Sequence, residues 1–160
     1  MSNKKYEFTG ETKEWRGHTL HRIRAIVDIA YVKAGEVGGW IESESNLSEN
    51  GDAWVYDDAW VYDDARVYGD ARVCGDAEVC GDAEVKQSSD YIVVKNCWSS
   101  MRWFTYTRSN KKWKVGCFHG TGEELIKKAY ADGETSGKCY EAIVRAVEAI
   151  EEATKKEETK

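Results

Sequence analysis

The chain has 160 residues, the size of one ordinary domain and too short for a large multidomain enzyme. With 41% hydrophobic and 12% aromatic residues it has enough apolar material for a core, so it is not disordered throughout. The net charge is −6, from 23 basic and 29 acidic residues, and by itself favours solubility rather than any partner. We find neither a signal-peptide pattern nor an apolar run of about 18 residues, and therefore expect a soluble, cytoplasmic protein without a membrane partner.

Five cysteines are spread through the sequence without CxxC spacing. An odd number of cysteines in this arrangement favours reduced thiols over a disulfide framework or a zinc site. We accordingly expect no metal and no cofactor.

Residues 1–34 are expected to form an N-terminal β-hairpin. Apolar and polar side chains alternate within 18–29 (HTLHRIRAIVDI), residues 6–8 supply a partner strand, and Arg16-Gly17 supplies the turn. The hairpin would cover the open edge of the structure that follows.

Residues 51–86 consist of six hexapeptides in unbroken register: GDAWVY, DDAWVY, DDARVY, GDARVC, GDAEVC and GDAEVK. Alanine and valine stand two residues apart in each, so they share one face of a short strand and point inward. Glycine and aspartate supply turn chemistry. Eighteen residues would then form one triangular coil of a parallel β-helix, and the period of six is typical of the left-handed kind. Continued backwards, the phase puts Ile41 and Leu47 on alanine positions and Val37 on a valine position, which extends the β-helix to residues 35–90.

Stacking at 18-residue spacing predicts the neighbours on the outer surface. Trp54 should lie against Arg72 as a cation–π pair, and Arg66 against Glu84 as an ion pair. The outward aromatic residues exceed what a monomer would leave in water, so we expect a side-by-side homo-oligomer, a dimer or trimer, formed by Trp54, Tyr56, Trp60, Tyr62 and Tyr68.

Residues 91–160 are expected to form a small sheet followed by two helices. The strands are predicted at 91–95, 102–108 and 112–117. Thr121 and Glu124 match a capping box and open a helix that ends near 131, and Gly133 and Gly137 separate it from a second helix at 138–153. The predicted fold class is mainly β: a short left-handed parallel β-helix capped by an N-terminal hairpin, a C-terminal sheet and two α-helices.

The motifs RIRAIVD, VKAGEVGGWI, NLS and GDAWVYD, between residues 20 and 57, resemble the first coils of bacterial hexapeptide-repeat proteins assigned as transferases. With WSS, FTYTRSN, KWKVGCF and GTGEELIKKAYAD, most of residues 6–150 is similar to uncharacterised left-handed β-helix proteins of phages, prophages and gut bacteria. The resemblance implies the fold and a mobile-element origin. It transfers neither an activity nor a catalytic residue.

An aspartate follows the first residue of every hexapeptide, and residues 51–86 carry 3 − 10 = −7 charges. Turn chemistry explains most of these aspartates. The functional hypothesis is a non-enzymatic binding protein whose acidic face imitates nucleic acid and binds a basic or nucleic-acid-binding host protein, as an anti-CRISPR-like inhibitor of a defence nuclease would. The predicted partner-binding residues are Asp52, Trp54, Asp58, Trp60, Asp64, Asp70, Asp76 and Asp82. The glycine-rich nonapeptide pattern of calcium solenoids is absent.

Residues 95–118 support an alternative hypothesis, the binding of a nucleotide or single-stranded nucleic acid. Cations alternate there with aromatic residues, as stacking sites require, and residues 87–130 carry 8 − 3 = +5 charges. The candidates are Arg102, Trp103, Arg108, Lys111, Lys112 and Trp113. Alternatively, the aromatic side chains are core beneath the helices and the cations face solvent.

A hexapeptide-repeat acyltransferase is the second alternative. Such enzymes use a histidine base in the coils, whereas His18, His21 and His119 all lie outside residues 51–86. Loss of activity on His119→Ala would be the minimum support, and no catalytic residue is assigned.

Overall fold

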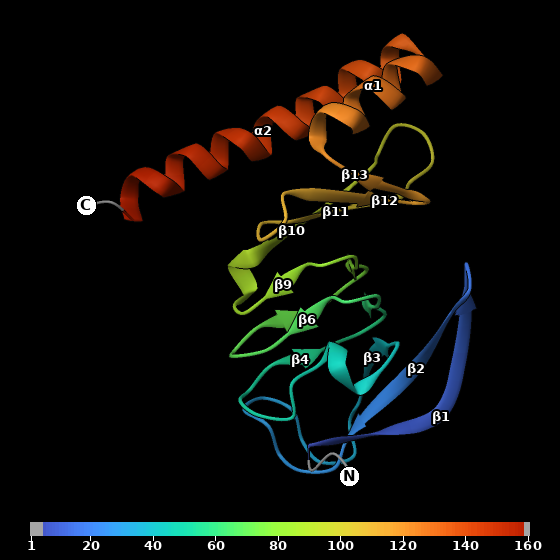
Figure 1. The fold of residues 1–160 in the computed structure, drawn as a ribbon, viewed down its shortest axis with the longest axis vertical. Coiled ribbons are helices and arrows are strands. Elements are labelled where there is room, and N and C mark those ends of the chain that lie inside the picture. Colours follow the sequence, from blue (N-terminus) through green and yellow to red (C-terminus); the bar gives the residue numbers. More distant parts are fainter. Residues whose placement is uncertain (1–4, 159–160) are drawn as a thin grey trace. The chain divides into compact units, whose positions relative to one another are not determined.

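The computed structural model describes residues 5–158 of the chain, and the side chains of residues 5–155. It is mainly β, with two helices and several sheets, as predicted (Figure 1). The chain divides into two compact units, Met1–Cys117 and Phe118–Lys160. The first unit contains β1 (Tyr6–Trp15), β2 (His18–Ala25), β3 (Val37–Ile41), β4 (Trp54–Val55), β5 (Trp60–Val61), β6 (Arg66–Val67), β7 (Arg72–Val73), β8 (Glu78–Val79), β9 (Glu84–Val85), β10 (Tyr91–Lys95), β11 (Trp103–Thr107) and β12 (Lys112–Val115).

The N-terminal hairpin forms as expected, with a longer first strand. β1 and β2 pair antiparallel around Arg16 and Gly17, which both have positive φ (47° and 87°), as right-twisting two-residue hairpin turns require. The first strand was predicted only at residues 6–8. It continues to Trp15 because mostly exposed polar side chains there can pair through the backbone without an alternating pattern.

The six hexapeptides form two-residue strands that pair in parallel at 18-residue spacing, which confirms the predicted register between layers. Trp54 pairs with Arg72, Trp60 with Glu78 and Arg66 with Glu84, and successive layers follow one another in Figure 1. Every alanine and valine of the repeat is at most 1% exposed. The core is therefore a column of small and branched side chains in register.

The first residue of each hexapeptide has positive φ, between 51° and 74°. Glycine takes this conformation freely, and aspartate is among the few other residues that tolerate it. At the two positions with aspartate, the carboxylate bonds the next layer: Asp57 Oδ2 accepts from Gly75 N (3.0 Å) and Asp63 Oδ2 from Gly81 N (3.1 Å). These two turns therefore connect layers as well as reversing the chain.

The phase extrapolated into residues 35–50 is wrong by two residues. Ile41 pairs with Val61 and Leu47 bridges to Val67, both 20 residues ahead, so they stand on valine positions. Ser48 N bonds the carbonyl 19 residues ahead, whereas Asp52 N bonds the one 17 ahead. Two additional residues thus lie in the turn between Ser48 and Asp52. Val37, expected to point inward, is 51% exposed.

Two 3-10 turns, Glu44–Asn46 and Ser88–Asp90, border the repeat and use the same side-chain device. Asn46 Oδ1 accepts from the amides of Glu42 and Ser43 (3.1 and 2.8 Å). Asp90 Oδ2 accepts from the amides of Lys86 and Gln87 (2.9 and 3.0 Å). In each case one side-chain oxygen accepts hydrogen bonds from two successive backbone amides at the start of the turn.

Lys5 satisfies carbonyl groups next to the additional two-residue turn. It is 3% exposed, and its Nζ donates to Ser48 O (3.1 Å) and to Ala53 O. Burial lowers its pKa from 10.5 to about 8, although the charge of Asp52 acts in the opposite direction. The protonated amine is therefore less favourable in the folded state than in the unfolded state.

This pKa predicts that stability rises with pH above about 8. Between the folded pKa of about 8 and the unfolded value of 10.5, the unfolded state binds more protons, so raising the pH favours folding. Lys5→Met removes this titration. As the pH rises from about 8 to 10.5, we expect the unfolding free energy of the wild type to increase by about 2 kcal/mol relative to that of Lys5→Met. Urea unfolding of both proteins at a series of pH values measures the difference, in which other alkaline titrations cancel. A constant difference would contradict the assignment.

β10, β11 and β12 form an antiparallel sheet beside the last hexapeptides. The first strand has the predicted bounds, and the other two are one to two residues shorter at their ends. Side chains of β11 and of the turn between β11 and β12 accept hydrogen bonds from backbone amides of the repeat: Thr105 Oγ1 accepts from Glu78 N (3.0 Å) and Ser109 Oγ from Glu84 N (2.8 Å). Backbone donors that a further coil would have satisfied therefore have partners.

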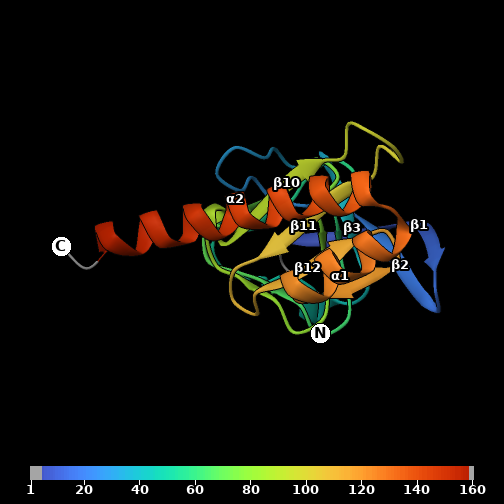
Figure 2. The same cartoon turned by 90° about the horizontal axis from the view of Figure 1, so that it is seen from above.

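The second unit contains β13 (Phe118–Gly120), α1 (Gly122–Asp132) and α2 (Glu134–Glu158). The predicted capping box is present, with Thr121 N donating to Glu124 Oε2 (2.9 Å) and Glu124 N to Thr121 Oγ1 (3.2 Å). The helices lie side by side (Figures 1 and 2). Within the described residues, neither helix is long and apolar enough to cross a membrane.

Gly137 does not interrupt the second helix, contrary to the expectation. α2 begins at Glu134, because Gly133 alone ends α1. A Cβ at Gly137 would lie 2.2 Å from the Tyr130 ring. The glycine is therefore explained by close helix packing rather than by a break.

Candidate functional site

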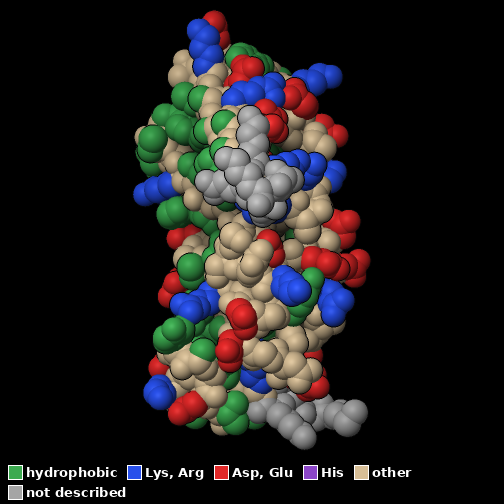
Figure 3. Space-filling view, turned by 90° about the vertical axis from the view of Figure 1, so that its left-hand side faces the viewer, with side chains coloured by type: hydrophobic (Ala, Val, Ile, Leu, Met, Phe, Trp, Pro, Cys, Tyr) green, Lys and Arg blue, Asp and Glu red, His purple; other side chains and the backbone are tan. Residues whose placement is uncertain are grey.

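The predicted partner-binding aspartates all lie at the surface. Asp52, Asp58, Asp64, Asp70, Asp76 and Asp82 are exposed, and the parallel pairing places them in three columns: 52 with 70, 58 with 76, and 64 with 82. Some have partners within the chain: Arg22 Nη1 lies 3.5 Å from Asp58 Oδ1, and Asp82 Oδ1 accepts from Asn110 Nδ2 (3.0 Å). On the face seen in Figure 3, acidic and basic side chains are interspersed rather than separated by sign.

Trp54 does not belong to the exposed surface, which corrects its assignment as a partner-binding residue. It is 1% exposed, and the edge of its ring meets Tyr6 at a centroid distance of 6.3 Å. The predicted stacking partner, Arg72, instead places its guanidinium 4.3 Å from the Tyr31 ring centre. The repeat pattern gives no sign of this burial, because the covering Tyr6 side chain comes from the distant hairpin.

The hairpin also contacts Trp60 and Tyr62, two of the other aromatic residues from which an oligomer was predicted. The Trp15 ring meets Trp60 at 5.3 Å, and the His18 ring lies 4.9 Å from Tyr62, which is 4% exposed. A dimer or trimer stays a prediction, and these rings no longer argue strongly for it.

Trp60 lies at the rim of a cavity of about 430 Å³ in the first unit. The cavity is lined by residues of both predicted binding surfaces, the repeat 51–86 and the basic aromatic segment 95–118. Its lining consists of Lys13, Asp58, Trp60, Asp76, Glu78, Arg102, Trp103 and Gly116. Two indoles, three carboxyl groups and two cations thus converge at one place.

Glu78 is the most buried acidic group of this cavity. Burial raises the pKa of its carboxyl group, and the nearby Lys114 ammonium opposes that effect. Its Oε2 is buried and has no hydrogen-bond partner among the described residues. A ligand with a donor group would satisfy this oxygen.

Three of the six aromatic residues in the basic aromatic segment 95–118 are core, which agrees in part with the second interpretation of that segment. Trp113 is 2% exposed, Phe104 0% and Tyr106 6%, so Trp113 is wrong as a stacking residue. Trp103 remains 38% exposed, with Lys95 Nζ 5.9 Å from its ring centre. Arg102 and Lys111 are exposed, and Arg108 and Lys112 are half-buried.

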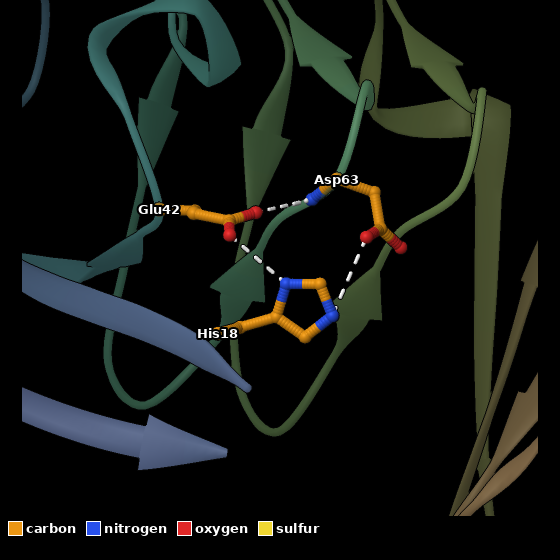
Figure 4. A group of neighbouring side chains, drawn as sticks. All are labelled: His18, Glu42 and Asp63. Carbon is orange, nitrogen blue, oxygen red and sulfur yellow. Dashed lines mark hydrogen bonds and ion pairs between the residues drawn. The ribbon is translucent and has the colours of Figure 1, made fainter. Parts of the chain in front are cut away.

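A second cluster joins the hairpin to the repeat (Figure 4). His18 Nδ1 lies 2.9 Å from Glu42 Oε1, and His18 Nε2 lies 3.4 Å from Asp63 Oδ1. Burial acts to raise the pKa of Glu42, but hydrogen bonds from His18 and from Asp63 N–H lower it below its usual value. One donor atom from each of the three residues lies within 4.8 Å of the others.

This cluster was not predicted from the sequence. Its members come from β2, from the end of β3 and from the turn after β5, at separations that match no ligand spacing. The available signal was Asp63 itself, because most hexapeptides have glycine at that position.

No family model matches the chain. A 38-residue segment is 47% identical to the uncharacterized acetyltransferase YdcK of Escherichia coli (strain K12). The match covers 24% of this chain and 12% of that protein. It is a local similarity to a transferase, and the chain spans a small part of the length of the protein that it matches.

Proposed function

We propose that the chain is a non-enzymatic binding protein that presents the aspartate columns of residues 51–86 to a basic macromolecular surface. The observation that carries the proposal is the Asp58–Asp76 column beside Trp60 and the cavity. Both carboxylates are exposed and held on a core whose alanines and valines are fully buried. Little side-chain or backbone ordering would then be required when a partner binds.

We further propose that the repeat is a left-handed parallel β-helix. Parallel pairing at 18-residue spacing and a positive φ at every third of a coil support this architecture. Adjacent layers would place the carboxylates of one column about 4.8 Å apart, a regular array of negative charge. Such an array attracts cationic surfaces through complementary potential.

The proposed partner is a basic, nucleic-acid-binding host protein such as a defence nuclease, and the proposed origin is a mobile element. The charge of −7 over residues 51–86 supports a basic partner, and the resemblance to phage proteins supports the origin. The 38-residue similarity to a transferase keeps an acyltransferase as the alternative.

Charge reversal at the column tests the proposal. We expect Asp58→Lys/Asp76→Lys to weaken inhibition of purified bacterial nucleases with basic clefts by about tenfold or more, and wild-type inhibition to fall as ionic strength rises. The matched control is Glu11→Lys/Glu44→Lys, which changes net charge equally at two exposed positions outside the repeat. DNA-cleavage rates at several salt concentrations measure the effect.

Two outcomes would contradict the proposal. Equal losses in both double variants would show a response to net charge rather than to the column. If the wild type inhibited none of the assayed nucleases in a salt-sensitive way, a nuclease would be excluded as the partner.

A further inference from the structure

The imidazole of His18 has a carboxylate oxygen at each of its two nitrogens. Glu42 Oε1 lies 2.9 Å from Nδ1, and Asp63 Oδ1 lies 3.4 Å from Nε2 (Figure 4). A neutral imidazole carries one N–H, so it can donate to only one of the two carboxylates. The other nitrogen then directs its lone pair at an anionic oxygen, which is unfavourable unless a second proton or a metal cation lies between them.

The two carboxylates are held in place by backbone amides. Glu42 Oε2 accepts from Asp63 N (2.8 Å), and Asp63 Oδ2 accepts from Gly81 N (3.1 Å). Each residue thus uses one oxygen for the backbone and leaves the other facing His18. Fixing ligand side chains in this way is what a preformed metal site requires.

The two distances assign different roles to the two carboxylates. The 2.9 Å contact at Nδ1 is an ordinary hydrogen-bond length, and it fixes the tautomer that protonates Nδ1. The 3.4 Å separation at Nε2 is long for such a bond. It is close to the spacing of about 3.4 Å between two ligands bound tetrahedrally to zinc at about 2.1 Å.

We propose that His18 Nε2 and Asp63 Oδ1 bind one divalent transition-metal ion, with Zn²⁺ the best fit, and that Glu42 orients the imidazole through Nδ1. Imidazole and carboxylate are ligands that zinc accepts, and two carboxylates with a neutral histidine match the charge of a dication. The side chains are 27%, 30% and 37% exposed, so water can complete the coordination. The site is independent of the aspartate columns.

Zinc titration of the reduced protein tests this site. Because five free cysteines also attract zinc, the measurement is a difference: we expect the wild type to bind one more Zn²⁺ than His18→Ala in calorimetry. His21→Ala is the matched control, since His21 stacks on Phe8 at 4.5 Å outside the cluster. It should keep the wild-type stoichiometry.

Asp63→Asn provides a variant that keeps the fold. Asparagine tolerates the positive φ and still accepts from the Gly81 amide, so only the charge of the ligand is lost. We expect its affinity for Zn²⁺ at the site to fall by about tenfold or more. Imidazole ¹⁵N NMR should show a zinc-induced shift at His18 Nε2 with Nδ1 remaining protonated. Equal stoichiometry in the wild type and His18→Ala, or protons on both nitrogens in the presence of zinc, would overturn the proposal.

Discussion

Replacing Asn46 by alanine is expected to lower the unfolding free energy by about 3 kcal/mol or more. Asn46 is fully buried, and its carboxamide makes hydrogen bonds to four backbone groups. It accepts from the amides of Glu42 and Ser43 and donates to the carbonyls of Asp63 (3.1 Å) and Ala65 (2.8 Å). Alanine leaves these buried and partly buried backbone groups without their side-chain partner, which costs more than the bonds themselves contribute.

Asp90 provides the comparison for this prediction. It occupies the same place in the second 3-10 turn, but it is only half-buried and its Oδ2 accepts from two amides. Asp90→Asn keeps an acceptor oxygen and should cost less than about 1 kcal/mol. Asn46→Asp keeps the acceptor but turns a carboxylate toward two carbonyls, so its loss should approach that of alanine. Urea unfolding followed by circular dichroism measures all three; equal, small losses would show that the four bonds do not stabilise the fold.

The hexapeptides illustrate what a sequence determines about its own fold. Ala53, Val55 and their equivalents recur without a slip, and one repeated pattern fixes strand, turn and layer spacing together. The predicted phase was wrong in residues 35–50, immediately before the repeat begins. A turn that is longer by two residues between Ser48 and Asp52 shifts the phase without changing the hydrophobic character of Ile41 or Leu47, so no residue signals the shift.

The candidate sites were harder to predict because they depend on which segments lie against each other. Asp58 and Trp60 were predicted from the repeat, and Arg102 and Trp103 from a basic segment, yet no local pattern shows that they line one cavity. Trp54 and Trp60 have the same sequence environment and different exposures, because Tyr6 covers the first and Trp15 meets the second. His18 depends on the same hairpin. Its contacts follow from how β2 packs, which strand alternation does not specify.

Gly39→Ala is expected to destabilise the protein by about 3 kcal/mol, although alanine is the smallest possible addition. A Cβ at this position in β3 would lie 2.7 Å from Ala59 O and 3.0 Å from Tyr56 O. Both atoms belong to the backbone of the next layer of strands, so relief requires the layers to separate and the Trp40–Trp60 pairing to open.

Gly75→Ala separates this steric effect from the conformational preference of glycine. Gly75 has a φ of 67°, and a Cβ there would meet nothing within 4 Å, so alanine costs only backbone strain of about 1 kcal/mol. Gly75→Asn should cost still less, because Asp57 and Asp63 show that a short polar side chain fits the same turn position. Thermal and urea unfolding of the three variants should therefore rank Gly39→Ala far below the other two. If Gly75→Ala proved the more damaging change, the turns rather than the close contact between coils would limit the stability of this repeat.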